Sequence, residues 1–368
     1  MSKIKVLHII KSLGRGGAEM LLPETLKIHD QDVFEFHYIY FLPWKDQMVE
    51  ALKVAGGKVY CFEAKDNIRL LLQYKDIIKY CLENKIDVIH CHLPWAGFVG
   101  RIVHKKTGIP VLYTEHNMQE RYHIATKTIN KFSFNSQNLA FGVSEDVSQS
   151  IKKNINPVIP VKTILNGVNT DSFISSQNSS IRTDLGIPEN AIVIGNVAVF
   201  RFQKRIVEWL KIIDDLRKTN DDVYGIIVGA GPLENEIKTK WRQLGLEGTV
   251  FLVGLQTNVK PYFEAMDIFM MSSSFEGLPI ALLEAMSMEC AVVSTDAGGI
   301  KEVIRANKDG LVVPVDEWQK LTSKVQSLID NNGKLSKFKR AARKRVVDSF
   351  SLKRMVEELE RYYQEVKG

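Results

Sequence analysis

Two glutamates frame one short stretch of this chain, and that stretch constrains the fold more than any other. Glu276 and Glu284 lie eight positions apart, and Gly277-Leu278-Pro279 follows the first of them directly. An apolar helical pattern begins at the proline, which is favoured at the first helical position because its missing N–H costs nothing there. The sequence therefore predicts Glu276 in a loop just before a helix, and Glu284 more than one turn inside that helix.

The start of this helix is also predicted to bind an anion. The backbone N–H groups of Gly277, Leu278 and the first helical turn have no partner inside the helix, and they point to where the helix begins. An acid, an anion site and a second acid in sequence suit a phosphorylated sugar that is held at both ends.

The bulk composition sets broad limits. At about 150 residues per domain, a chain of 368 residues suggests two domains. The net charge of +6 suits an anionic ligand or an acidic membrane surface, but it is too small to require either. We find no feature that calls for a nucleic acid partner.

Localisation follows from cysteine usage and hydropathy. The four cysteines are scattered without a Cys-x-x-Cys pair, which favours a reduced compartment. The apolar run Val6–Ile10 ends at Lys11, too early for a signal-peptide core, and no later run reaches the ~18 apolar residues of a membrane span. We therefore expect a cytoplasmic protein.

Short apolar strands alternate with helical patterns in both halves, which indicates parallel sheets built from βαβ units. A polar segment, 169–190, separates the halves and places the domain boundary near residue 170. The predicted strands are 5–10, 34–41, 88–92, 111–114, 141–144, 192–199, 224–228, 250–253, 268–271 and 291–294, and the clearest helices are 18–28, 206–216 and 352–366.

Six further motifs accompany the glutamate pair. They are Gly14-Arg-Gly-Gly-Ala-Glu19, Thr114-Glu-His-Asn117, Val143-Ser-Glu145, Asn166-Gly-Val-Asn169, Arg201-Phe-Gln-Lys204 and Val228-Gly-Ala-Gly-Pro-Leu233. In this order, and with Glu276 and Glu284, they resemble the retaining glycosyltransferases of the GT-B fold, specifically glycosyltransferase family 4 (group 1). The resemblance spans nearly the whole chain.

The resemblance implies an α/β fold of GT-B architecture, with two Rossmann-like parallel-sheet domains facing a central cleft. Residues 1–170 would form the acceptor-side domain and residues 171–350 the nucleotide-sugar-binding domain. The terminal helix, 351–368, would cross back to the N-terminal domain.

The resemblance also assigns roles to residues. Glu284 would bind the ribose hydroxyls and Glu276 the donor sugar, with Gly277, Leu278, Pro279 and Ile280 beside the sugar and diphosphate. Arg201 and Lys204 would hold the diphosphate, where two fixed cations stabilise the departing group without a metal. Further donor contacts would come from Gly16, Gly17, Gly229 and Leu255. The catalytic set would be Glu276, His116, Arg201 and Lys204, with His116 touching the donor sugar.

The implied activity is that of a retaining, hexosyltransferase-type enzyme. It would move a sugar from a nucleotide-sugar, taken to be UDP-linked, to a glycan or lipid-linked acceptor in cell-surface polysaccharide biosynthesis. No metal and no cofactor are expected. Peripheral contact with the inner face of the membrane stays open.

Other functions remain as alternatives. They are a nucleotide-sugar epimerase or phosphorylase-like enzyme of the same fold, and a non-catalytic nucleotide-sugar-binding protein. An NAD-dependent oxidoreductase is disfavoured, because residues 14–17 do not form Gly-x-Gly-x-x-Gly and no acid ends the second strand.

Three other patterns are given structural interpretations. His90 and His92 share one face of a strand, but no third ligand is evident nearby, so we expect no metal site there. Asp30-Gln31-Asp32 lacks any supporting motif. The basic stretch Lys334–Arg345 is expected to be a solvated helix face. One departure from the family pattern lies at Phe202 and Gln203, where many relatives have proline and glutamate, and Arg205 follows where they commonly have Gly, Asn or Asp.

Overall fold

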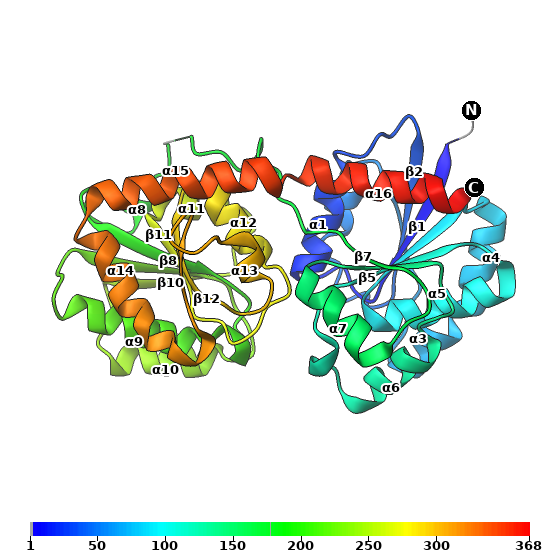
Figure 1. The fold of residues 1–368 in the computed structure, drawn as a ribbon, viewed down its shortest axis with the longest axis horizontal. Coiled ribbons are helices and arrows are strands. Elements are labelled where there is room, and N and C mark those ends of the chain that lie inside the picture. Colours follow the sequence, from blue (N-terminus) through cyan, green and yellow to red (C-terminus); the bar gives the residue numbers. More distant parts are fainter. Residues whose placement is uncertain (1–2, 177) are drawn as a thin grey trace. The chain divides into compact units, whose positions relative to one another are not determined.

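The computed structural model describes residues 3–176 and 178–368, and the chain divides into two compact units. Unit 1 comprises the residues up to Asn166 together with Leu352–Gly368, and unit 2 comprises Gly167–Ser351. Each unit is built around one sheet with helices on its faces (Figure 1). All strand pairs within the two sheets are parallel, so the α/β prediction of two Rossmann-like domains is confirmed.

Unit 1 has a seven-stranded sheet in the order β3-β2-β1-β4-β5-β6-β7. Its strands are β1 (Ile4–Ile10), β2 (Phe34–Tyr40), β3 (Lys58–Cys61), β4 (Val88–His92), β5 (Val111–Glu115), β6 (Leu139–Gly142) and β7 (Val161–Thr163). Its helices are α1 (Gly17–Leu26), α2 (Val49–Val54), α3 (Asn67–Leu72), α4 (Tyr74–Asn84), α5 (Leu93–Thr107), η1 (Gln119–Arg121), α6 (Ile124–Ser133), α7 (Glu145–Ile155) and α16 (Leu352–Lys367).

Unit 2 has a six-stranded sheet in the order β10-β9-β8-β11-β12-β13. Its strands are β8 (Ile192–Val197), β9 (Val223–Val228), β10 (Val250–Gly254), β11 (Ile268–Met271), β12 (Ala291–Thr295) and β13 (Leu311–Val313). Its helices are α8 (Ile181–Asp184), η2 (Phe202–Lys204), α9 (Ile206–Arg217), α10 (Glu234–Gln243), α11 (Lys260–Ala265), α12 (Ile280–Ser287), α13 (Ile300–Val303), η3 (Val315–Lys320), α14 (Leu321–Ile329) and α15 (Asn332–Ser349).

The central strands are buried on both faces, which explains their nearly continuous apolar sequences. In unit 2, β11 is fully buried from Ile268 to Met271, and Trp209 of α9 packs beneath the sheet with its indole N–H donating to Met270 O at 3.1 Å. In unit 1, β1 and β4 are equally buried but carry histidines among their apolar residues: His8, His90 and His92.

Helix α16 belongs to unit 1. Its apolar side, with Met355, Val356, Leu359 and Tyr363, is buried, and α16 packs against α1 and β4. Polar contacts add to this: the Glu360 carboxylate lies 2.9 Å from His29 Nδ1 and accepts the backbone N–H of Asp30 at 2.8 Å.

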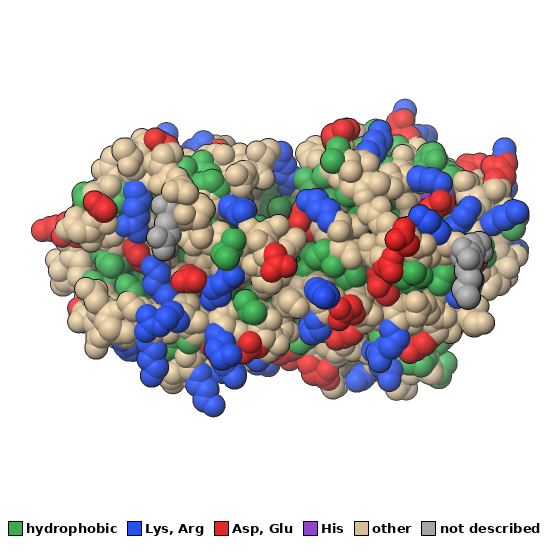
Figure 2. Space-filling view, turned by 90° about the horizontal axis from the view of Figure 1, so that it is seen from above, with side chains coloured by type: hydrophobic (Ala, Val, Ile, Leu, Met, Phe, Trp, Pro, Cys, Tyr) green, Lys and Arg blue, Asp and Glu red, His purple; other side chains and the backbone are tan. Residues whose placement is uncertain are grey.

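The basic stretch Lys334–Arg345 lies on α15, and the expectation that it is simply a solvated face is only partly met. Lys339 pairs with Asp267 at 3.0 Å, and Arg343 and Arg345 donate to backbone carbonyls of unit 2. Figure 2 shows basic and acidic side chains together over the face that it presents. No helix of the described residues is both long and apolar enough to cross a bilayer.

Candidate active site

The two glutamates of the opening stretch lie at the carboxyl end of β11 in unit 2, in the predicted order of strand, loop and helix. Glu276 is in the loop and Glu284 is on α12, and only 9% and 7% of these residues are exposed. Glu276 Oε1 accepts a hydrogen bond from Ser273 Oγ at 2.6 Å and lies 2.6 Å from Lys204 Nζ. The carboxyl end of a parallel strand is where open α/β sheets bind ligands.

The helix begins one residue later than predicted. Pro279 is the residue before α12, with extended backbone angles (φ −73°, ψ 120°), and Ile280 is the first helical residue. Among the described residues, the backbone N–H groups of Gly277, Ile280 and Ala281 donate to no protein acceptor. Since these donors lie at a helix start beside a lysine, the place is suited to an anion.

The loop from Arg201 to Arg205 connects β8 to α9 and is tied to the β11 loop. Ser272 Oγ donates to the carbonyls of Lys204 and Arg205, at 3.1 and 2.8 Å, and Ser274 N donates to Gln203 O at 2.8 Å. These bonds fix the backbone of Lys204 against the segment that carries Glu276.

The two neighbouring arginines differ in their contacts. Arg201 is exposed, and within the part of the chain that the structure describes its guanidinium has no hydrogen-bond partner. Arg205 instead donates to Val315 O at 2.8 Å and holds a left-handed backbone (φ 49°). Arg201 is therefore the arginine of this loop that is available to a ligand.

Gly298 and Gly299, which follow β12, contact the backbone of Glu276 and Gly277. Neither of these two glycines was predicted from the sequence. Gly298 (φ +56°) lies so close to Glu276 that a Cβ there would be 2.0 Å from the Glu276 carbonyl oxygen. Gly299 N donates to Gly277 O at 2.9 Å. Glycine is required at 298 both for its backbone angle and for this close approach. The adjacent glycines after a buried strand were the signal that could have found it.

The predicted donor contacts Gly229 and Leu255 lie at the ends of β9 and β10. Gly229 has φ +140°, and a Cβ there would be 1.9 Å from Ala198 O. Its N–H donates to Gly254 O at 2.8 Å, which places it next to the exposed Leu255. Gly229 and Leu255 thus follow the carboxyl ends of strands in the unit 2 sheet, as Lys204 and Glu276 do.

In unit 1, the predicted residues Gly16 and Gly17 lie where β1 leads into α1. Gly16 is the residue before the helix and Gly17 its first residue. Ser12 Oγ donates to Glu19 Oε1 at 3.1 Å across this loop, and a Cβ on Gly16 would press on the Glu19 carboxylate. The loop is thus closed on itself by a local hydrogen bond.

His116 follows β5 and is positioned by Glu115, whose side chain is fully buried. The Glu115 carboxylate accepts the backbone N–H groups of His116 and Asn117 at 2.9 and 3.2 Å. It also accepts bonds from Tyr113 Oη, Tyr122 Oη and Gln119 Nε2. Burial raises the pKa of Glu115, and these hydrogen bonds oppose the rise. In the sequence, Glu115 is recognisable only as part of the Thr114–Asn117 motif, and this positioning role could not be predicted from it.

The His116 ring continues into a buried group of imidazoles. Burial lowers the pKa of His116 to about 4, so the ring is neutral at neutral pH. Its Nε2 lies 3.4 Å from Nδ1 of His92, and Nε2 of His92 lies 2.9 Å from Nδ1 of His8. The expectation that no third histidine accompanies His90 and His92 is therefore wrong, because β1 brings His8 into register beside His90.

Sequence profiles of two families cover nearly all of this structure. "Glycosyltransferase Family 4" matches residues 16–172, and "Glycosyl transferases group 1" matches residues 177–345. The chain belongs to the group 1 glycosyltransferases of the GT-B fold.

Curated relatives of this glycosyltransferase align over its whole length. It is 23% identical to the UDP-Gal:alpha-D-GlcNAc-diphosphoundecaprenol alpha-1,3-galactosyltransferase of Escherichia coli, over 98% of this chain and 97% of the relative. It is 25% identical to a Campylobacter jejuni alpha-1,4-N-acetyl-D-galactosaminyltransferase that acts on a diphosphoundecaprenol-linked glycan, over 99% of each chain.

Solved structures show the same fold. Anabaena HepE, in complex with UDP and glucose, superposes with a TM-score of 0.86 at 20% identity, covering 98% of this glycosyltransferase and 100% of HepE. A glycosyltransferase from Rickettsia africae superposes with a TM-score of 0.85 at 20% identity, covering 100% and 99%. At 20% identity, this similarity supports the fold alone.

Proposed function

We propose that this glycosyltransferase transfers a hexose from a UDP-linked donor to a lipid-linked or glycan acceptor in polysaccharide biosynthesis, with retention of the anomeric configuration. The observation that carries the proposal is the arrangement at the end of β11. There the Lys204–Glu276 pair lies beside backbone N–H groups that have no acceptor among the described residues. The names of the two curated relatives support the donor and acceptor classes, since both name undecaprenol-diphosphate acceptors and one names UDP-galactose.

In this proposal the donor is bound mainly by residues 171–350. The ribose hydroxyls donate to the Glu284 carboxylate, which is acceptor-only and can take two vicinal O–H groups. Glu276 holds the hydroxyls of the sugar, and the N–H groups of Gly277 and Ile280 face the diphosphate. Leu278, which is 4% exposed, keeps the loop packed. Gly229 and Leu255 line the nucleotide side.

Arg201 and Lys204 would stabilise the charge that develops on the departing diphosphate. Fixed cations do this without reorganisation at the moment of reaction, and removal of one such group typically costs about 10²–10³ in rate. Because both cations come from the protein, we propose that no divalent cation is needed at the diphosphate.

Residues 1–170 would contribute His116, Gly16 and Gly17 to the donor and would carry the acceptor. The neutral His116 ring can accept or donate a hydrogen bond to a sugar hydroxyl without adding charge. The departing phosphate oxygen would itself take the proton of the acceptor hydroxyl, on the same face of the sugar that it leaves. This step places the new bond where the old one was and so retains the configuration.

The donor is tested by a thermal-shift screen across nucleotide-sugars, because a specific donor raises the melting temperature. The matching donor is then incubated with an undecaprenyl-diphosphate-linked sugar, and UDP release and product are measured. An α-linked product from an α-linked donor, identified by NMR, supports retention, whereas a β-linked product contradicts it. Conversion of the donor to another nucleotide-sugar without acceptor would favour the epimerase alternative, and binding without turnover the non-catalytic one.

A further inference from the structure

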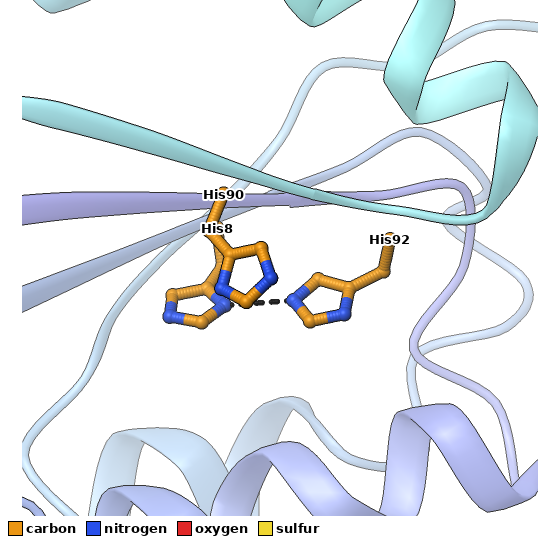
Figure 3. A group of neighbouring side chains, drawn as sticks. All are labelled: His8, His90 and His92. Carbon is orange, nitrogen blue, oxygen red and sulfur yellow. Dashed lines mark hydrogen bonds between the residues drawn. The ribbon is translucent and has the colours of Figure 1, made fainter. Parts of the chain in front are cut away.

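Unit 1 contains three buried histidines that the proposed transfer does not use. His8 on β1 and His90 on β4 are partners in the parallel register, and His92 lies two residues further along β4 on the same face. All three residues are at most 5% exposed, and one ring nitrogen from each lies within 4.8 Å of the others. Figure 3 shows the three rings gathered between the strands and the helices that cover them.

The strand geometry directs these side chains to one place. Successive residues of a strand face opposite sides, so Cys91 lies on the other face, where its Sγ meets Gly100 of α5. His90 and His92 face α1 and α16 instead, where a cavity of about 20 Å³ opens beside His8, His116 and Thr114. That volume holds about one water-sized group.

The polar atoms of the group are incompletely satisfied. Within the part of the chain that the structure describes, the buried His8 Nε2 has no hydrogen-bond partner, and neither has the hydroxyl of Tyr38, which stacks on His8 at 5.0 Å between ring centroids. Buried polar atoms without partners are rare in native proteins and call for an explanation, such as a water bound there.

From this juxtaposition we propose that His8, His90 and His92 form a binding site for a divalent transition metal ion, best matched by Zn²⁺. Imidazole nitrogen is a preferred ligand of Zn²⁺, and three histidines with an open fourth position make a known type of site. The cavity is large enough for the water that would take that position. The ion would be held entirely by unit 1 and would have no part in binding the diphosphate.

Protonation and outer contacts suit ligands of this kind. Burial lowers the pKa of His90 to about 3, and it places the pKa values of His8 and His92 well below their ordinary value, so all three rings are neutral. His90 Nδ1 lies 2.7 Å from Tyr363 Oη, and His92 Nδ1 lies 3.4 Å from His116 Nε2. Such outer hydrogen bonds orient ligating imidazoles and leave the second nitrogen for the metal.

Binding requires small rearrangements. The bond between His8 Nδ1 and His92 Nε2, 2.9 Å, must be exchanged for the ion, and so must the 2.7 Å bond from His90 Nε2 to Thr114 Oγ1. Zn–N bonds of about 2.1 Å set tetrahedral ligand atoms about 3.4 Å apart. The His8 and His92 nitrogens, now 2.9 Å apart, must therefore open slightly, and the wider pairs, which lie within 4.8 Å, must close by up to about 1.4 Å. Among the described residues, no carboxylate lines the cavity, so a bound hydroxide would be needed to offset part of the ion's charge.

The test uses the full chain after removal of metal with a chelator. Zn²⁺ is titrated in competition with a chromophoric indicator, and Co²⁺ is followed by its visible absorption. We expect one equivalent of either ion per chain and a Zn²⁺-dependent rise in melting temperature. His8→Gln and His92→Gln should each weaken Zn²⁺ binding by on the order of 100-fold.

His104→Gln is the matched control, because His104 lies on α5, outside the group, and bonds to Ile109 O. It should bind Zn²⁺ like the wild type. No uptake by the wild type, or equal uptake by His8→Gln, His92→Gln and the control, overturns the proposal. If the variants fail to fold, X-ray absorption of the Zn²⁺-loaded wild type decides: fewer than three nitrogen neighbours of imidazole type at about 2.1 Å excludes the site. Sugar transfer is measured separately, since its absence would bear on the proposed function and not on the metal.

Discussion

Lys204 and Glu276 form an ion pair, with Nζ 2.6 Å from Oε1. The family resemblance predicts that these two residues bind different parts of one ligand. Both are largely buried, with side-chain exposures of 20% and 9%. A lysine held by a carboxylate is fixed in position and is partly neutralised until an anion arrives. The pair is therefore a preorganised element, and a diphosphate placed next to it would share the lysine with Glu276.

Replacing Lys204 tests this arrangement. Lys204→Ala should lower kcat/KM for transfer by about 10²–10³, because a fixed cation at the leaving group is lost. It should also lower the free energy of unfolding by about 1–3 kcal/mol, since among the described residues the Glu276 carboxylate would then keep the Ser273 hydroxyl as its one side-chain partner.

The matched control is Lys238→Ala, which removes a surface pair of the same length, 2.6 Å, with Glu234. Exposed pairs of this kind contribute less than about 1 kcal/mol, and transfer should be unchanged. Chemical denaturation and steady-state kinetics measure both effects. If Lys204→Ala and Lys238→Ala had the same kcat/KM, Lys204 would have no role in transfer.

A substitution at Gly298 offers a second test. There the cost of a left-handed backbone can be separated from the cost of a steric clash with Glu276. Gly298→Ala adds a Cβ at 2.0 Å from Glu276 O on a left-handed backbone of φ +56°. Gly245→Ala has nearly the same backbone, φ +62°, but nothing within 4 Å of the new Cβ. The control should lose about 1–2 kcal/mol of stability from backbone strain alone and keep full activity.

Gly298→Ala should lose more than the control and should also weaken donor binding, because the loop of Glu276 and Gly277 must move. The measurement is the donor Kd by calorimetry, with the free energies of unfolding of both variants. If Gly298→Ala kept the donor affinity of the wild type, the glycine pair would have no role in shaping the site.

The fold, and the loop and helix that hold Glu276 and Glu284, could be predicted because they depend on local sequence patterns. Apolar strands alternating with helical periods indicate parallel sheets, and Gly277-Leu278-Pro279 marks the start of α12 to within one residue. The strands that the sequence did not predict are short and lie at sheet edges: β3, β7 and β13. Edge strands are less buried, so their hydrophobic signal is weak; β3 has no buried residue.

What could not be predicted depends on contacts between distant segments. His8 lies more than eighty positions from His90 and His92, and only the strand order β1-β4 brings it beside them. Likewise, the Lys204–Glu276 pair spans 72 positions, and no periodicity joins them. Family resemblance predicted that both residues belong to the site. Their contact with each other is seen only in the structure.

The cysteines provide a check on burial in both units. Cys81, Cys91 and Cys290 are buried, and burial raises the pKa of each thiol to about 12. At pH 8 only about one such thiol in 10⁴ is ionised, and the thiolate is the reactive form. Cys61 is exposed. A thiol reagent should therefore modify one cysteine per chain quickly in the native protein and all four after denaturation.

Cys61→Ser is the control for this measurement, and it should abolish the fast phase. Because Cys61 alone is accessible, its rate should rise with pH while the three buried thiols stay silent. Two or more fast thiols in the native protein would show that β4, α4 or the segment before β12 opens readily.

Glu115 gives the last test, because it links the stability of unit 1 to the position of His116. Its carboxylate accepts from two backbone N–H groups, two tyrosine hydroxyls and the Gln119 amide. Glu115→Gln replaces one acceptor oxygen with an NH₂ group that faces these donors. Unfolding should become easier by about 1–3 kcal/mol, the cost of leaving buried polar groups unsatisfied.

The effect on transfer should exceed what stability explains. Where the NH₂ group takes the place of Oε1, the His116 N–H loses its acceptor and its ring shifts. In that case kcat should fall while the affinity for UDP alone stays near that of the wild type, because the residues proposed to bind the nucleotide lie in unit 2. Glu120→Gln is the matched control: Glu120 bonds to Ser150 and Asn154 at the surface and touches no part of the proposed site. Kinetics and UDP titrations on both variants separate the cases. An unchanged kcat in a folded Glu115→Gln protein would mean that His116 is not positioned by Glu115 or is not needed for transfer.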